Sequence, residues 1–484
     1  MNLKEKAISG AKWTSMATVV VVLIQVFRLM ILTRFLDKEE FGIVAIITFI
    51  LGLTYTFSDI GFSVAIMHTK HIDDKEFSSL FWSQFLIFSL IYIALSFSAP
   101  WIASFYNEVS ISYLMPIALI DLVLSGIGKL YDTVLQKTMQ FKKIALRNII
   151  SAFCSVLVAL ILAVHGFGIY SMIISTLSQT LINNLWNFLL GQQQYKIKLF
   201  CSISKIKPFF RIGIYQTGTQ IIDYFCSKLD ILIIGKFFGS EILGVYSLAK
   251  ELVLKLVLII NSIVNKVALP ILSYNNDNNH FLRTQYCKII NFLSLINFPI
   301  NTFLCIFSYH IVFLLYGQKY SDVAPLVSIL SIYGIMLSIG NPVGNITIAK
   351  GRTDISFKYV LLRSIISIVL ITISSFYSIR IVAWSQVIMM IILFAIAWRM
   401  IIYRLIQLPI LNYIKSFSGI GLISLAVGIP FFIIVHYNIF YIDNLIFQLI
   451  VYGIMLLLSY IILLNFFMKK ELLIILKEFI KIKL

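Results

Sequence analysis

The sequence predicts an all-α polytopic membrane protein of about fourteen transmembrane helices. We expect two six-helix lobes that are parallel repeats, followed by two C-terminal helices. The first observation is composition: of 484 residues, 60% are hydrophobic and 12% are charged, against roughly 45–50% and about 25% in soluble domains. The second is a series of apolar runs along the whole chain, and the third is an internal repeat.

Fourteen apolar segments have about the 20 residues that a helix needs to cross a bilayer. They lie near 13–35, 42–66, 80–105, 111–131, 146–165, 168–190, 210–235, 242–268, 288–315, 324–348, 359–378, 381–402, 416–435 and 445–467. The first run has no small-residue cleavage site after it, so we expect an uncleaved span. A soluble globular fold, a disordered chain and a disulfide-rich secreted fold are excluded.

Basic residues gather in every second loop. Of the 39 Lys and Arg, 28 lie before residue 13, in 70–75, 137–147, 196–211, 283–288, 350–363 and 399–415, and after 468. The other loops hold Arg34, Lys38, Lys236, Lys319 and Arg380. Because cytoplasmic loops carry the excess of Lys and Arg, we expect both termini in the cytoplasm. The net charge of +18 then reflects topology and requires no nucleic acid.

A shift of 202 residues brings two halves of the chain into register. It places Ala11-Lys12-Trp13 on Gly213-Ile214-Tyr215, Arg34-Phe35-Leu36 on Lys236-Phe237-Phe238, Glu39 on Glu241, and Gly42-Ile43 on Gly244-Val245. Six spans are an even number, so the repeats are parallel. We expect an N-terminal lobe at 1–200, a C-terminal lobe at 201–410, two further spans at 411–468 and a cytoplasmic amphipathic tail at 469–484.

Polar residues follow one face of the seventh span and of its repeat equivalent, the first span. The two stripes are Gln216, Gln220, Asp223, Ser227 and Asp230, and Thr14, Thr18, Val21, Gln25 and Arg28. A charge at the bilayer centre costs roughly 2.5–3.5 kcal/mol even on the lenient scale. Each stripe should therefore face a hydrated cavity or a partner. Arg28 and Asp230 are equivalent, so we expect them to face each other.

Other polar residues also lie inside predicted spans. We interpret four cations as suited to an anionic head group, with four amides beside them: Arg28, Lys228, Lys250 and Lys255, with Gln25, Gln216, Gln220 and Asn183. We expect the carboxylates Asp223, Asp230 and Glu251 to pair with these cations or to carry a coupling proton or sodium ion. For Asp59 and Asp121 we favour a structural role. The alternative for the whole set is ion pairs and amide bonds that hold the bundle together.

Motifs for catalysis and for metal binding are missing from the sequence. It has no Walker loop, no HExxH, no serine nucleophile elbow and no Cys/His cluster. The five Cys are scattered and read as small packing residues. The predicted outer loops are too short for a membrane glycosyltransferase or polymerase. We therefore expect no enzyme activity, no cofactor and no metal.

Several stretches resemble a known family, the Wzx-type polysaccharide biosynthesis flippases of the multidrug/oligosaccharidyl-lipid/polysaccharide exporter superfamily. The resemblance is carried by Asp59-Ile60-Gly61-Phe62 with Leu80-Phe81-Trp82, Leu135-Gln136-Lys137, Asp230 to Gly239 with Leu243-Gly244-Val245-Tyr246, Leu315-Tyr316-Gly317, and Ala349-Lys350-Gly351-Arg352. It covers nearly the whole chain and is nearest to the colanic-acid and teichuronic-acid type exporters.

The resemblance implies a cargo and a mechanism. The cargo would be an oligosaccharide repeat unit on undecaprenyl pyrophosphate, moved from the cytoplasmic to the outer leaflet of the bacterial inner membrane by alternating access. It would feed O-antigen, capsule or exopolysaccharide assembly. The implied partners are this cargo, membrane lipids, a polysaccharide polymerase and the chain-length machinery. Two alternatives stay open: a cation-coupled multidrug exporter of the same superfamily, and a flippase for the peptidoglycan lipid precursor.

Overall fold

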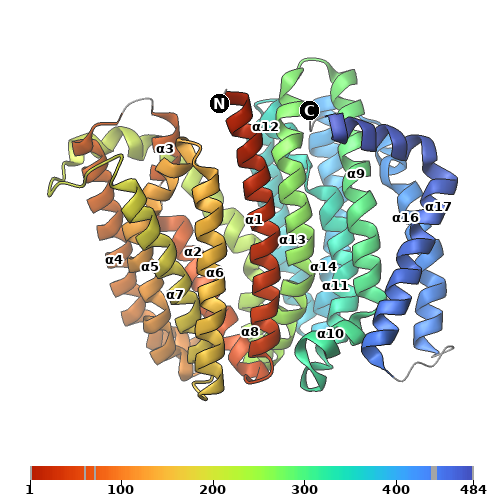
Figure 1. Cartoon of the computed structure of the whole chain (residues 1–484), viewed down its shortest axis with the longest axis horizontal. Coiled ribbons are helices and arrows are strands. Elements are labelled where there is room, and N and C mark those ends of the chain that lie inside the picture. Colours follow the sequence, from red (N-terminus) through yellow and green to blue (C-terminus); the bar gives the residue numbers. More distant parts are fainter. Residues whose placement is uncertain (1–2, 59–60, 70–71, 438–443, 482–484) are drawn as a thin grey trace. The chain divides into compact units, whose positions relative to one another are not determined.

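A computed structural model confirms the all-α class (Figure 1): every regular element among the described residues is a helix. The structure describes residues 3–58, 61–69, 72–437 and 444–481. It describes their side chains except at 3–8, 11, 58, 64, 65, 68, 203–217, 219 and 469–481.

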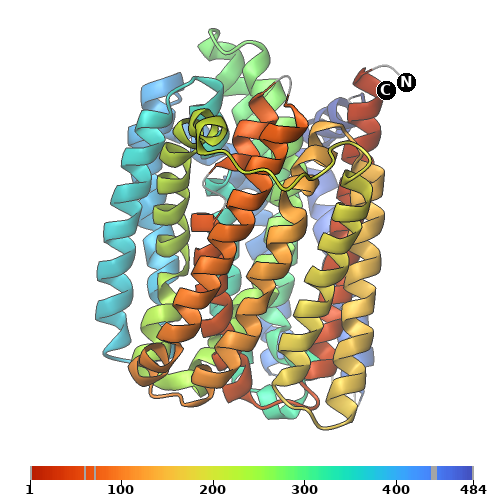
Figure 2. The same ribbon diagram turned by 90° about the vertical axis from the view of Figure 1, so that its left-hand side faces the viewer.

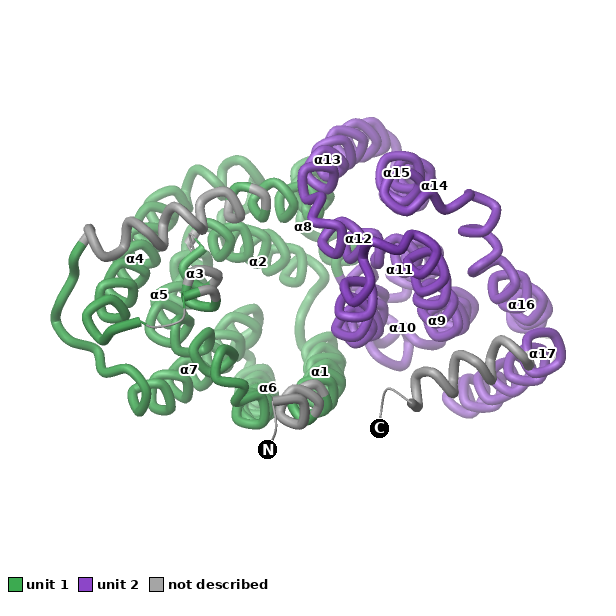
Figure 3. Tube along the Cα trace, turned by 90° about the horizontal axis from the view of Figure 1, so that it is seen from above, with its two compact units in different colours: residues 1–247 green, residues 248–484 purple. Residues whose placement is uncertain are grey.

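The chain folds into two compact units (Figure 3). Unit 1 is Met1–Ser247 and unit 2 is Leu248–Leu484. The boundary between them falls inside one long helix, α8 (Ile203–Tyr274), so it is a different division from the predicted repeat boundary at 200/201, which stays a prediction. Within each unit the helices run side by side as a bundle, seen end-on in Figure 3.

Within its described residues, unit 1 contains seven helices before α8. They are α1 (Leu3–Leu32), α2 (Lys38–Ser58), α3 (Phe62–His68), α4 (Asp74–Tyr106), α5 (Ser110–Lys137), α6 (Phe141–Val164) and α7 (Tyr170–Gly191). Helix α4 begins at a capping box, in which the Asp73 side chain accepts from the Glu76 N–H and Glu76 accepts from the Asp73 N–H. It ends at Asn107, whose left-handed φ of 58° stops the helix.

Unit 2 begins in the second part of α8. Its further elements are α9 (Asn279–Ile306), α10 (Ser308–Tyr316), the 3₁₀ turn η1 (Gln318–Tyr320), α11 (Val323–Gly340), α12 (Val343–Ala349), α13 (Thr353–Ser375), α14 (Ile379–Ala397), the π-helical η2 (Trp398–Tyr403), α15 (Arg404–Ile406), α16 (Ile410–His436) and α17 (Leu445–Lys481).

The number of spans agrees with the sequence prediction. Twelve helices among the described residues are long and apolar enough to cross a membrane. One of them, Gln220–Tyr274, has 55 residues and contains non-helical Gly239, so it supplies two segments of spanning length. Helix α7 also has spanning length, with 22 residues, but its many Ser, Thr, Asn and Gln residues make it less apolar than these twelve. With these two adjustments the described chain has fourteen helices of spanning length.

Several span ends differ from the prediction. The span expected at 42–66 is divided into α2 and α3, because Gly61 has φ 75° and cannot continue a helix. The span expected at 288–315 is divided into α9 and α10 at Phe307. The break expected at Asn341-Pro342 is confirmed, since α11 ends at Gly340 and α12 begins at Val343. Helix α17 runs beyond 467, with non-helical dihedral angles at Met468.

An aromatic cluster holds one end of α4 against α5. The Phe77 ring stacks on Tyr195 with centroids 4.7 Å apart and lies 5.0 Å from Tyr131. The Tyr131 hydroxyl donates to the Tyr195 carbonyl at 3.0 Å. Figure 2 shows the segment that connects α7 to α8 crossing this end of the bundle, where the Lys198 N–H donates to Ser78 Oγ at 2.9 Å. The cluster thereby fixes the turn of α5 that carries the polar residues described below.

Two glycines bring repeat-equivalent backbones together inside unit 1. A Cβ on Gly42 would lie 1.8 Å from the Ser240 carbonyl oxygen, and a Cβ on Gly244 would lie 1.9 Å from that of Lys38. The 202-residue shift equates Gly42 with Gly244 and Lys38 with Ser240. The contact is therefore reciprocal, and it requires glycine at both positions.

Candidate functional site

The polar stripe of the first span lines a cavity inside unit 1. Thr14, Thr18, Val21 and Gln25 of α1 face Asn148 of α6 and Gln179 of α7 across a cavity of about 300 Å³. The Thr14 and Thr18 hydroxyls donate to carbonyls one turn earlier, each at 2.8 Å. Three side-chain amides, one each from α1, α6 and α7, therefore line this cavity.

Arg28 lies further along the same helix. Its Nη1 donates to Ser155 Oγ of α6 at 3.0 Å. Ser155 is buried and donates in turn to the Ser175 carbonyl of α7 at 2.7 Å. The arginine is therefore joined to α6 and α7 through a hydroxyl relay, and its predicted pairing with Asp230 stays a prediction.

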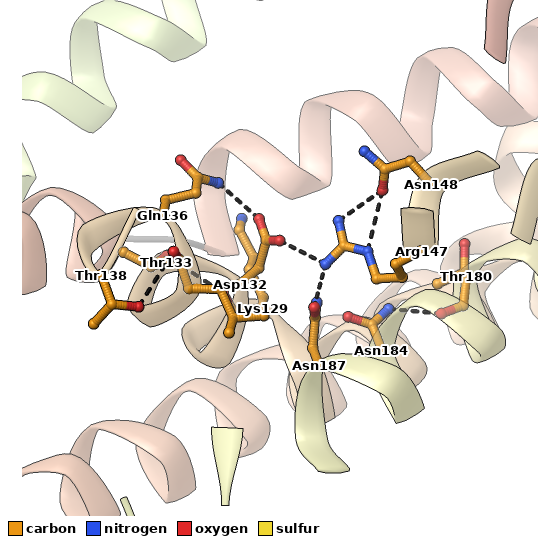
Figure 4. Close-up of polar contacts among 11 residues, drawn as sticks. Lys129, Asp132, Thr133, Gln136, Thr138, Arg147, Asn148, Thr180, Asn184 and Asn187 are labelled. Atoms are coloured by element: carbon orange, nitrogen blue, oxygen red, sulfur yellow. Dashed lines mark hydrogen bonds and ion pairs between the residues drawn. The ribbon is translucent and has the colours of Figure 1, made fainter. Parts of the chain in front are cut away.

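A second, more polar cavity of about 250 Å³ lies between four helices of unit 1, and we call it the polar pocket. It is lined by Tyr55 of α2, Ser125, Lys129 and Asp132 of α5, Arg147 of α6, and Thr180, Asn183, Asn184 and Asn187 of α7. Much of this set is drawn in Figure 4. All nine lining side chains are polar, so the pocket suits water or a hydroxyl-rich ligand rather than an apolar one.

Arg147 is the centre of the hydrogen-bond network on one wall of the polar pocket (Figure 4). Its Nη1 lies 2.7 Å from Asp132 Oδ1 and also donates to Asn187 Oδ1. Its Nη2 donates to Asn148 Oδ1 at 2.7 Å. The Gln136 amide completes the carboxylate shell by donating to Asp132 Oδ2 at 2.8 Å. Because Arg147 is only 6% exposed, these bonds are what make its charge tolerable inside the bundle.

Lys129 lines another wall of the polar pocket, and the Asp121 carboxylate lies behind that wall. The Lys129 ammonium lies 5.6 Å from the ring centroids of both Tyr55 and Phe88, which are cation–π contacts. The Tyr55 hydroxyl donates to the Asp121 carboxylate and lies 2.6 Å from Ser125 Oγ. Asp121 is 5% exposed. Tyr55 therefore connects a buried carboxylate to the wall of the polar pocket.

The stripe of the seventh span lies on the part of α8 that belongs to unit 1. Gln220 and Asp223 are exposed, and Lys228 is half-buried. Asp230 is buried and accepts a hydrogen bond from the Tyr246 hydroxyl at 2.6 Å. The Gln216 side chain and Asp59 lie outside the described residues, so their predicted roles stay predictions.

The remaining predicted charges are in unit 2, on the second part of α8. Lys250 is buried. Lys255 Nζ lies 2.5 Å from Glu251 Oε1, the ion pair expected from their i,i+4 spacing. The structure thus distributes the predicted site residues over both units. Of the full set, it brings Asn183 to the wall of the polar pocket and Asp121 behind that wall.

Sequence reasoning missed most of the polar pocket. Tyr55 was not singled out among many aromatic residues, and Arg147 was counted with the basic loops because it lies near the predicted start of a span. The sequence does predict part of it, because Gln179, Asn183 and Asn187 of the sixth span follow one helix face. Two of these, Asn183 and Asn187, line the polar pocket. Within the described residues, no group of three or more His, Cys, Asp and Glu could hold a metal ion.

Comparisons with known proteins agree with this description. Residues 31–325 match the model of a family described as polysaccharide biosynthesis protein. The chain is 28% identical over 363 residues to the lipopolysaccharide biosynthesis protein WzxC of Escherichia coli (strain K12), covering 74% of this chain and 73% of that protein. It is 29% identical over 434 residues to the teichuronic acid biosynthesis protein TuaB of Bacillus subtilis (strain 168), covering 88% and 89%.

A solved structure shows the same fold. The lipid II flippase MurJ in an inward closed conformation superposes with a TM-score of 0.76 at 17% identity, covering 95% of this chain and 99% of that one. At this identity the likeness is one of fold.

Proposed function

The chain belongs to the family of polysaccharide biosynthesis proteins, and we propose that it is a flippase for a lipid-linked oligosaccharide. The cargo is an oligosaccharide repeat unit on undecaprenyl pyrophosphate, and it moves from the cytoplasmic to the outer leaflet of a bacterial inner membrane by alternating access. The protein is a transporter without catalytic activity of its own. It works beside the polymerase and chain-length proteins that assemble the polysaccharide.

The observation that carries this proposal is the polar pocket inside a unit built from apolar helices. Lys129, Arg147 and five amide or hydroxyl side chains of α5 and α7 face one cavity. Buried charges and amides in a membrane protein mark the path of a polar substrate. The pocket offers both hydrogen-bond donors and acceptors to sugar hydroxyls. It has no apolar wall for the hydrocarbon part of a cationic drug.

We assign Arg28 to the diphosphate of the cargo. A guanidinium binds phosphate oxygens through two parallel N–H bonds, and Ser155 holds this one in a fixed orientation. Lys250 and Lys255, in unit 2, keep the same predicted role, with Glu251 as the counter-ion of Lys255. We propose that Gln25 and Asn183, each on the wall of a cavity in unit 1, hydrogen-bond the glycan.

Deletion of the gene in its host tests the function. We expect one surface polysaccharide to disappear and its lipid-linked repeat unit to accumulate, and a plasmid copy to restore both. An unchanged set of polysaccharides together with raised sensitivity to cationic dyes would instead identify a drug exporter. Arrested cell-wall synthesis with accumulated peptidoglycan precursor would identify the remaining alternative.

Substitution tests the assigned site. Arg28→Ala should lower polysaccharide export at least ~10-fold, because one charge-assisted contact contributes about 1.5–3 kcal/mol. Arg34→Ala, in the exposed turn after α1, is the matched control and should export normally. Normal export by Arg28→Ala at equal membrane abundance would remove Arg28 from the site.

A further inference from the structure

A basic cavity lies in unit 2, and the proposed transport function assigns no role to its residues. It has a volume of about 830 Å³ and is lined by Arg283, Arg399, Met400, Tyr403, Arg404, Gln407 and Pro409. Three guanidinium groups on one cavity are unusual in a chain whose charged fraction is 12%. We call this cavity the arginine pocket.

The backbone around the arginine pocket is irregular in a defined way. Residues Trp398–Tyr403 form a π-helical turn, a rare conformation that is frequent at functional sites. Gln407 follows with a left-handed φ of 53°, which is uncommon for a residue other than glycine. The chain therefore turns back on itself immediately after presenting Arg399 and Arg404.

Buried side chains and hydrogen bonds hold this turn in place. Ile402 and Ile406 are fully buried, and Trp398 Nε1 donates to the Leu408 carbonyl at 3.0 Å. Arg283 of α9 holds the same turn, because its Nε donates to the Ile406 carbonyl at 2.6 Å and its Nη2 to Gln407 Oε1 at 3.1 Å. The backbone turn that carries Arg399 and Arg404 is therefore held in place by buried side chains and by Arg283.

Within the part of the chain whose side chains the structure describes, the positive charge of the arginine pocket is not neutralised. Among the described residues, no carboxylate forms an ion pair with Arg283, Arg399 or Arg404. The Arg399 guanidinium lies 5.3 Å from the Tyr403 ring centroid, a contact that orients it without cancelling its charge. A cavity with three uncompensated cations calls for an anionic ligand.

The position of the arginine pocket identifies the kind of anion. It lies where three apolar spanning segments begin or end: Asn279–Ile306, Ile379–Ile406 and Ile410–His436. This is the level at which a bilayer changes from acyl chains to head groups. Leu411, two residues beyond Pro409, is 67% exposed and offers an apolar surface for an acyl chain. The excess of basic residues in these loops predicts the cytoplasmic leaflet, which is the anionic one.

We propose that the arginine pocket binds the phosphate head group of an anionic glycerophospholipid of the inner leaflet. Arg399 and Arg404 contact the phosphate oxygens, and Arg283 holds the turn that presents them. The bound lipid joins α9 to the start of α16. This inference does not depend on which cargo the protein carries.

The test is native mass spectrometry of the purified full-length protein with added phosphatidylglycerol or phosphatidylcholine. We expect phosphatidylglycerol to bind at least ~10-fold more tightly, and the double variant Arg399→Gln/Arg404→Gln to lose that preference. Arg380→Gln, at the opposite end of α14, is the matched control and should retain it. Both substituted arginines are exposed, so an unchanged thermal midpoint checks that the variant is folded.

Three results would overturn the assignment. One is phosphatidylglycerol binding by the folded double variant that equals binding by the unsubstituted protein. Another is displacement of the lipid by millimolar inorganic phosphate, which would identify a site for soluble phosphate. The third is preferential, Arg399- and Arg404-dependent binding of a polyprenyl diphosphate, which would make the arginine pocket a contact for cargo.

Discussion

Arg147 carries a positive charge into the interior of unit 1 and is matched there bond for bond. Asp132 neutralises it, and Asn148 and Asn187 accept three further N–H bonds from it. The sequence shows the polarity of each of these residues. It does not show that α5, α6 and α7 bring them together, because periodicity gives the face of a helix and not the neighbour of that face.

Removal of the Arg147 charge should destabilise unit 1. Arg147→Gln leaves Asp132 without its ion pair, and we expect a loss of about 1–3 kcal/mol, read as a lower thermal midpoint in detergent. The double variant Arg147→Gln/Asp132→Asn should recover part of it, because both charges are then gone. Lys143→Gln, exposed on the same helix, is the control. An unchanged midpoint in Arg147→Gln would show that the network contributes nothing to stability.

A charge exchange tests the predicted pairing of Arg28 with Asp230. If the two side chains interact, Arg28→Asp and Asp230→Arg should each abolish export, and the double exchange should restore part of it. The structure gives each residue another contact, Ser155 and Tyr246 respectively, so only partial restoration is expected. Failure of the double exchange to exceed either single variant would assign the two residues separate roles.

At the scale of helices, the first span follows its sequence closely. Four of the five positions in its predicted stripe line one cavity. The interruption of α11 at Asn341-Pro342 was also predictable, since proline lacks the N–H that a helix interior needs. The division of α2 from α3 was not predicted, because the apolar pattern continues through Gly61 and only its positive φ ends the helix.

The reciprocal glycine contact provides a test at this scale. Gly244→Ala would place a methyl group 1.9 Å from the Lys38 carbonyl oxygen, so backbone must move, at a cost of about 1–3 kcal/mol for overpacking. Gly344→Ala, where a Cβ would meet nothing within 4 Å, is the matched control. The thermal midpoint of each purified variant is the measurement. Equal midpoints for Gly244→Ala and Gly344→Ala would contradict a close contact.

At the scale of the whole molecule, composition predicts the fold class, and the distribution of charge predicts the orientation in the membrane. Apolar length alone predicts the fourteen spans and the all-α class, because a bilayer allows few other solutions. The family followed from short motifs spread along the chain. The polar pocket and the arginine pocket could not be predicted in this way, since each depends on which helix faces pack against one another.

The predicted topology is testable with fusions to the C-terminal end. The excess of Lys and Arg in alternate loops predicts that this end lies in the cytoplasm, where green fluorescent protein is fluorescent and alkaline phosphatase is inactive. The same reporters joined after Arg380, in a predicted outer loop, serve as the opposite control. An active phosphatase at the C-terminal end would contradict the predicted cytoplasmic position of this end.

The most direct measurement of the central claim is the leaflet in which the lipid-linked glycan lies. Intact spheroplasts with and without the protein are treated with a membrane-impermeant oxidant of sugars, and the modified fraction of lipid-linked repeat unit is determined. We predict that modification falls sharply when the protein is depleted and returns when it is resupplied. Equal modification in its presence and absence would show that this protein does not move the lipid-linked glycan across the membrane.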